Sequence, residues 1–119
     1  MRVNEVISKS RLVVLAYNLI VLGEDILNIS SKNKSKSEVN VIARTFSKAF
    51  TDITADDYFT IINHDFSDVN ANINIDYDNI KDFVIVAYGA VQSEYEYSDE
   101  RMQIEVGIDP EECKVLGLN

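Results

Sequence analysis

Apolar residues in the first part of the chain recur with helical spacing. Between residues 4 and 28 they lie three and four positions apart along one face, and Val13, Val14 and Ile20 occupy the other faces. A helix that is apolar all round is a buried one. The pattern therefore predicts a buried helix over about 4–28, while its β-branched residues are also compatible with a strand or hairpin.

Two more helices are predicted after a polar loop. Residues 30–37 are all Ser, Lys or Asn, so we expect a solvated loop there. An apolar stripe runs through 38–52, with Ser37 as its N-cap. A third helix is predicted to begin at Thr54, because Asp57 three residues later completes a pattern that resembles a capping box.

In the following part of the chain, the apolar spacing changes to two. Over 69–78, apolar residues alternate with Asn and Asp, which predicts a strand with one polar face. Residues 102–109 alternate in the same way and predict another strand. Between them, 83–91 is rich in β-branched residues and is predicted as a central strand, although apolar residues from Ile80 to Val91 also fit a helical stripe.

The last predicted element is a short helix. Asp109 suits the N-cap and Pro110 the first helical position, and Glu111 and Glu112 favour the positive end of the helix dipole. We expect this helix to end near Gly117.

The order of these elements defines the expected fold class. Helices come first and strands follow, which predicts an α+β fold with N-terminal helices packed on one face of a three- to four-stranded antiparallel sheet. A length of 119 residues indicates a single domain over 1–119. The hydrophobic fraction of 46% is ordinary for a globular protein and too high for a disordered acidic tail.

Charge is divided unevenly along the chain. Residues 1–48 carry eight Lys or Arg and four Asp or Glu, whereas 49–119 carry three and sixteen, so charges of +4 and −13 combine to the net −9. The acidic part is expected to attract cationic partners and to repel nucleic acid and anionic lipid. The longest apolar run, 12–22, is far shorter than the roughly 20 residues that span a bilayer, so no membrane partner is expected.

Catalytic, metal and cofactor motifs are not recognisable in the sequence. His64 is the only histidine, which leaves a zinc site short of ligands, and we expect it near the end of a helix. The alternation that begins at Asp68 fails as a calcium loop, because Ile73 stands where such a loop needs Gly. Cys113, the only cysteine, is expected to be a buried apolar residue in a reducing cytoplasm. We therefore expect a non-enzymatic, cytoplasmic protein without a cofactor.

The strongest candidate for partner binding is the acidic segment 94–100, which contains two tyrosines. Tyrosine is common at binding hot spots, and the surrounding carboxylates would pair with basic groups. The competing interpretation is a solvated hairpin connection whose charges protect an edge strand. The predicted partner-binding residues are Asp76, Asp78, Glu94, Tyr95, Glu96, Tyr97, Asp99 and Glu100.

These features favour a small acidic binding protein. The leading hypothesis is an immunity protein, antitoxin or phage-type inhibitor that covers the basic surface of a nucleic-acid-handling protein. The alternatives are a homodimeric structural or chaperone-like module, which needs a large apolar patch, and a small hydrolase with an unrecognised site. Three lysines between Lys32 and Lys36 are a weak signal for nucleic acid, so no direct nucleic-acid partner is expected.

Overall fold

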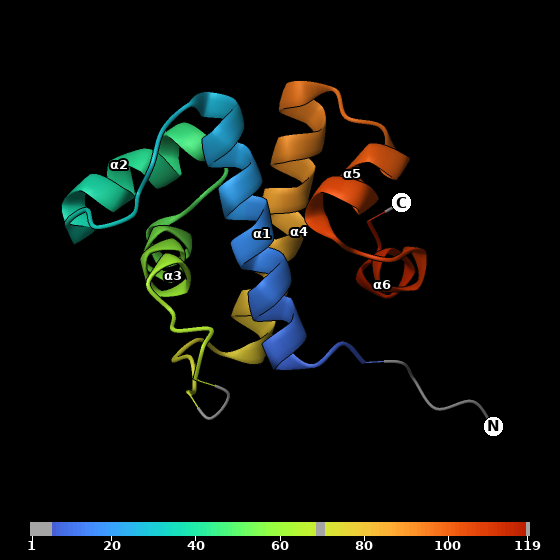
Figure 1. Ribbon diagram of the computed structural model, residues 1–119, viewed down its shortest axis with the longest axis horizontal. Helices are drawn as coiled ribbons and strands as arrows, with labels where there is room; N and C mark the ends of the chain where they lie inside the picture. Colours follow the sequence, from blue (N-terminus) through green and yellow to red (C-terminus); the bar gives the residue numbers. More distant parts are fainter. Residues whose placement is uncertain (1–5, 69–70, 119) are drawn as a thin grey trace.

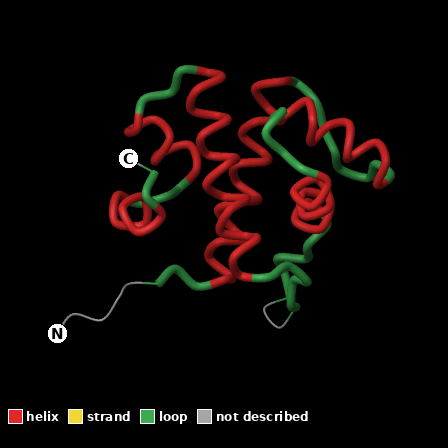
Figure 2. The backbone as a smooth tube through the Cα atoms, turned by 180° about the vertical axis from the view of Figure 1, so that it is seen from behind, coloured by secondary structure: helices red, strands yellow, loops and turns green. Residues whose placement is uncertain are grey.

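The computed structural model describes residues 6–68 and 71–118, and every regular element within these ranges is an α-helix. Two long helices lie side by side at the centre, with a pair of shorter helices on each side (Figure 1). The view from behind shows the same arrangement (Figure 2). The helices are α1 (Lys9–Leu27), α2 (Lys36–Phe46), α3 (Asp52–Ile62), α4 (Tyr77–Tyr95), α5 (Asp99–Val106) and α6 (Pro110–Leu116).

The predicted antiparallel sheet, and with it the α+β class, is wrong, because the described part of the chain contains no strand. The expected central strand, 83–91, lies within α4. The buried residues of α4 fall three or four positions apart, from Ile80 through Phe83, Val84 and Ala87 to Val91, so the helical stripe decides the structure. Packing against α1 outweighs the modest strand preference of the β-branched residues.

The expected strand over 69–78 is also absent. Residues 69 and 70 lie outside the described ranges, 71–76 form an irregular connection, and 77 begins α4. Ile73 and Ile75 are nevertheless buried, whereas Asn72 and Asn74 are exposed. The alternation therefore indicates an irregular segment with one buried side. This side packs on helices and not on neighbouring strands.

The third expected strand, 102–109, is replaced by α5 and the residues after it. Met102 and Val106 are buried one helical turn apart, while Ile104 is 80% exposed, which a buried strand face would not allow. The helix begins after Ser98, whose side chain accepts from the Arg101 N–H, and ends at Gly107. Gly107 has a φ of 76°, which glycine adopts readily.

The predicted helices are present, with shifted ends for those in the first part. The helix expected over about 4–28 spans Lys9–Leu27, and residues 4 and 5 of the expected range lie outside the described residues. Ser35 rather than Ser37 caps α2, and Thr51 rather than Thr54 caps α3. The C-terminal helix is confirmed at both ends: Asp109 caps α6 in a capping box, and Gly117 ends it.

The two central helices run in the same direction. Their N-terminal ends lie at the same end of the molecule (Figure 1). Two hydrogen bonds join the segments there, from Tyr77 Oη to the Ile7 carbonyl at 2.5 Å and from Lys9 Nζ to the Ile73 carbonyl at 3.1 Å. Parallel neighbours cannot be joined by a tight turn, so the chain returns to the start of α1 through α2, α3 and the connection 63–76.

The α2–α3 side of the molecule is fastened by buried groups. Four aromatic rings, Phe46, Phe50, Tyr58 and Phe83, contact one another at centroid distances of 5.3–6.3 Å. Glu24, only 6% exposed, accepts hydrogen bonds from the Tyr58 hydroxyl and from the side chain and backbone of Ser31. This carboxylate ties α1 to α3 and to the polar loop.

The α5–α6 side buries apolar residues of both helices in the core and is also held by polar contacts nearer the surface. Arg11 makes a two-pronged ion pair with Glu112, with N–O distances of 2.7 and 2.8 Å, and also donates to the Gly107 carbonyl. Asn18 donates to the Val106 carbonyl at 2.9 Å. The Arg11 guanidinium lowers the pKa of Glu112, and this carboxylate raises the pKa of Arg11. Both short helices are thus attached to α1 by two side chains.

Candidate functional site

The predicted partner-binding residues are divided between the two ends of α4. Asp76 is the N-cap of α4 and Asp78 lies in its first turn, whereas Glu94 and Tyr95 lie in its last turn. A helix of 19 residues is about 28 Å long, so Asp76 and Asp78 are far from the rest of the predicted set. The structure does not bring these two residues to the site.

The other six predicted residues lie together where α4 passes into α5. We call this group, Glu94, Tyr95, Glu96, Tyr97, Asp99 and Glu100, the acidic corner. Its four carboxylates are exposed and its two tyrosines are half-buried. The hairpin connection expected for this segment is wrong, because the corner joins two helices.

Two neighbouring residues, Gln92 and Arg101, contact side chains of the acidic corner without forming an ion pair with its carboxylates. Gln92 donates to Asp99 at 2.6 Å, and the Arg101 guanidinium lies 3.8 Å from the centre of the Tyr97 ring. Burial, and then the charge of Glu94, raises the pKa of Tyr95. No ion pair between described residues involves a carboxylate of the corner.

Glu96 is the least expected residue of the acidic corner. It ends α4 with φ 54° and ψ 41°, in the left-handed region, where α5 and α6 use Gly107 and Gly117 and α1 uses Asn28. A side chain with a Cβ is strained in this region. A negative charge is also disfavoured at the negative end of a helix. Glu96 therefore satisfies neither the backbone preference nor the helix dipole.

An exposed apolar residue adjoins the acidic corner and was missed by the sequence interpretation. Ile104 lies four residues after Glu100 on α5, so the two side chains are neighbours on the helix surface. Its 80% exposure is the highest among the exposed large apolar residues of the described chain. Ser98 and Gly107 mark the two ends of α5, and the four-residue spacing of Met102 and Val106 would then have placed Ile104 on the outside.

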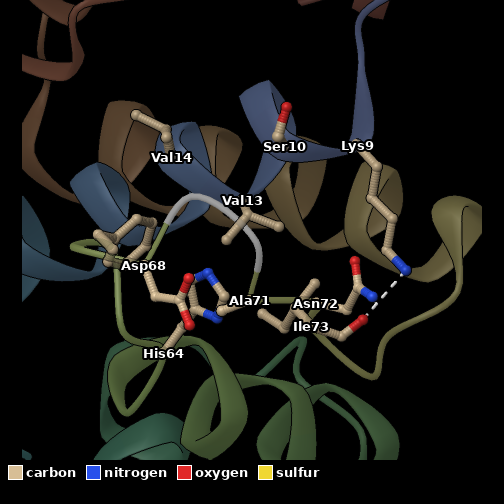
Figure 3. Close-up of a pocket in the computed structure, with 10 residues that line it drawn as sticks. Lys9, Ser10, Val13, Val14, His64, Asp68, Ala71, Asn72 and Ile73 are labelled. Carbon is tan, nitrogen blue, oxygen red and sulfur yellow. Dashed lines mark hydrogen bonds between the residues drawn. The ribbon is translucent and has the colours of Figure 1, made fainter.

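A second feature is a cavity of about 410 Å³ between the first turn of α1 and the α3–α4 connection (Figure 3). His64 lines it directly after the end of α3, as predicted from the sequence. Ser10 also lines the cavity, but its hydroxyl contacts Ser8 at 3.2 Å and points away from His64 in Figure 3. The pair is therefore not arranged as a nucleophile with its base.

Other candidate chemistry finds no support in the described residues. They contain no group of three His, Cys, Asp or Glu side chains arranged to hold a metal ion. Cys113 is fully buried, as expected, and burial raises the pKa of its thiol, which disfavours a nucleophilic role.

Within residues 6–68 and 71–118, no helix combines the length and apolarity needed to cross a membrane. Comparisons with protein-family models, with curated proteins and with solved structures give no match. The function therefore has to be inferred from the geometry of the chain itself.

Proposed function

We propose that this protein is a non-enzymatic, cytoplasmic binding protein of the immunity, antitoxin or phage-inhibitor kind. The acidic corner covers a basic surface on a nucleic-acid-handling partner, and its carboxylates take the places of phosphates. The partner is thereby blocked sterically and attracted electrostatically.

The observation that carries this proposal is the position of Glu96. A residue that violates both the left-handed backbone preference and the helix dipole lowers stability, and such violations concentrate at functional sites. Glu94 repeats the electrostatic conflict in the last turn of the same helix, which has no basic residue. A requirement for negative charge at this place explains why both are there.

The neighbourhood of Glu96 suits a protein partner better than a free cation. Tyr95 and Tyr97 offer half-buried rings, and Ile104 offers an apolar side chain beside Glu100. A centre of aromatic and apolar groups with charges around it is the usual composition of a binding hot spot. The partner is then expected to bring Lys or Arg side chains to the carboxylates and an apolar pocket to Ile104.

A capture experiment with a charge-neutralised variant tests the proposal. The immobilised protein is expected to retain, from an extract of cells that produce it, a protein with a basic nucleic-acid-binding surface that heparin releases. Neutralising the corner should abolish capture, while neutralising the same number of exposed carboxylates elsewhere should not. The corner variant is Glu94→Gln, Glu96→Gln, Asp99→Asn and Glu100→Gln, and the control is Asp25→Asn, Asp76→Asn, Asp78→Asn and Asp82→Asn.

A single substitution separates function from stability at the corner. Glu96→Gly should stabilise the protein by about 1 kcal/mol, because it relieves the left-handed backbone and removes the charge, and should slow association with the captured partner. Thermal unfolding and association rates between 50 and 500 mM NaCl measure both effects. Equal capture by both four-residue variants, or an association rate that salt does not change, would contradict the proposal.

A further inference from the structure

The cavity at the start of α1 has an apolar interior. Val13 points into it from α1, and Ala71 and Ile73 line it from the α3–α4 connection (Figure 3). Phe66 lines it from the turn after α3. Its volume of about 410 Å³ lies within the range of small-molecule sites and suits a ligand of roughly ten to fifteen non-hydrogen atoms. The interior therefore favours a ligand with an apolar body.

Aromatic contacts fix one wall of this cavity. The Phe66 ring lies between those of Tyr17 and His64, with both centroid distances at 4.8 Å. Phe66 is nevertheless 40% exposed, so its ring remains accessible from one side. A flat apolar group is the natural partner for such a wall.

The polar groups are arranged at the two ends of the cavity. Lys9 lies at one end, where its ammonium donates to the Ile73 carbonyl at 3.1 Å, and Asp68 lies with His64 at the other (Figure 3). The bond to Ile73 uses one of three ammonium protons and holds the charge in place. An anionic group is thus favoured at the Lys9 end and disfavoured at the Asp68 end.

The N-terminus of α1 adds to the positive potential at the Lys9 end. The N-terminus of α4 lies beside it (Figure 1), but the carboxylates of Asp76 and Asp78 there offset the α4 dipole. The first turn of α1 contains no acidic residue, whereas those of α2 to α6 contain at least one each. The dipole of α1 and the ammonium of Lys9 therefore act in the same sense on a bound anion.

We infer that this cavity binds a small aromatic or similarly flat monocarboxylate, with the carboxylate on Lys9 and the ring against Val13, Phe66 and Ala71. This ligand is separate from the protein partner of the acidic corner, which lies at the opposite end of the central helices (Figure 1).

The test uses phenylacetate as the probe and backbone amide NMR of the full chain as the measurement. Phenylacetate should shift the amides of 9–14 and 71–73 saturably, with a dissociation constant of about 1 mM. Its uncharged and cationic analogues, phenylacetamide and 2-phenylethylamine, should bind at least about tenfold more weakly, because only the carboxylate pairs with Lys9.

Two variants and one control locate the binding. Lys9→Met should weaken phenylacetate about tenfold and leave phenylacetamide unchanged, and Ala71→Phe should fill the cavity and remove binding of both. Lys36→Met is the matched control, because Lys36 is the first residue of α2 as Lys9 is of α1, yet it lies away from the cavity. The amide spectrum of each variant shows whether it is folded.

Three outcomes would overturn the inference. They are no saturable shift up to about 20 mM phenylacetate, equal binding of the amine or amide, and equal weakening by Lys9→Met and Lys36→Met. If Ala71→Phe does not fold, the comparison of phenylacetate binding by Lys9→Met and Lys36→Met decides whether the inference holds.

Discussion

The two sides of the central pair are built differently. The α2–α3 side is held by a fully buried aromatic cluster and by a carboxylate, Glu24, that is 6% exposed. The α5–α6 side has shorter helices. It also buries apolar residues such as Met102 and Cys113, but its polar attachments come from Asn18 and from Arg11, whose side chain is 34% exposed. The side whose polar attachments lie nearer the surface also carries the acidic corner.

This difference suggests that the α2–α3 side contributes mainly to stability and that the α5–α6 side contributes mainly to partner recognition. Residues that bind a partner must stay exposed and charged, so they contribute little to the core and often lower stability. On the α5–α6 side the chain compensates with contacts to α1 that leave the outer surface free. Four predictions test whether the two sides differ in this way.

The largest effect is expected at the contact between α1 and α2. A Cβ atom at Gly23 would lie 1.9 Å from Cε2 of Phe46, which is held by the rings of Phe50 and Tyr58. Gly23→Ala should therefore destabilise the protein by about 3 kcal/mol in urea unfolding. Gly89→Ala is the control: nothing lies within 4 Å of its added Cβ, so it should stabilise by about 0.5 kcal/mol. Equal effects of the two would show that the contact is loose.

The second prediction concerns the buried carboxylate on the same side. Tyr58→Phe removes a hydrogen bond to Glu24 and should destabilise by about 2 kcal/mol, because the carboxylate stays buried. The matched change is Tyr88→Phe, since the buried Tyr88 hydroxyl has no hydrogen-bond partner among the described residues. Thermal and urea unfolding of both variants should show a clearly smaller loss for Tyr88→Phe. The reverse order would be inconsistent with an important role for Glu24.

The third prediction concerns the attachment of α6. Glu112→Gln keeps the capping box but removes the charge that pairs with Arg11, and should destabilise by about 1.5 kcal/mol at pH 7. Since Arg11 lowers the pKa of Glu112 in the folded state, this stabilisation is present above the ordinary glutamate pKa and declines as the pH falls below it. Urea unfolding of both proteins from pH 7 to pH 3 should show the difference shrink. A constant difference over this range would contradict the ion-pair explanation.

The smallest effect is expected at Asp57, and its pH dependence has the opposite sign. Burial, and then the charges of Asp56 and Asp76, raises the pKa of Asp57 to about 6. The folded state therefore holds this proton more tightly than the unfolded chain, and stability falls as the pH rises from about 4 to about 6. Because the carboxyl group is partly open to water, Asp57→Asn should stabilise by only about 1 kcal/mol at pH 7. It should have little effect near pH 4, as thermal unfolding at the two pH values will show.

Sequence patterns were sufficient to predict a secondary-structure element where residues next to each other in the chain determine its ends. Asp109, Pro110 and Gly117 specify both ends of α6 through capping and backbone preferences alone. The burial of Ile73 and Ile75 against exposed asparagines was likewise predictable. A period of two shows which side chains are buried, but not whether a neighbouring strand or a helix covers them.

The errors occurred where distant contacts decide between two local patterns. In α4, β-branched residues favoured a strand and the stripe from Ile80 to Val91 favoured a helix, and packing against α1 selected the helix. The acidic corner was predicted from its composition. That Asp76 and Asp78 lie far from it was not predicted, because they are separated from it by the length of helix α4, which was interpreted as a strand. The cavity had no signal in sequence, because Lys9 and Ala71 meet only in the folded chain.

Because α2 and α3 lie between α1 and its parallel neighbour α4 in the sequence, a ribosome that has released α1 must still synthesise α2, α3 and α4 before the two can pair. At about 5–20 residues per second this takes several seconds, during which only α2 and α3 are present to shield the apolar surface of α1. Nascent α1 is therefore the segment that we expect chaperones to capture during translation, and the segment from which aggregation would start if α4 were delayed.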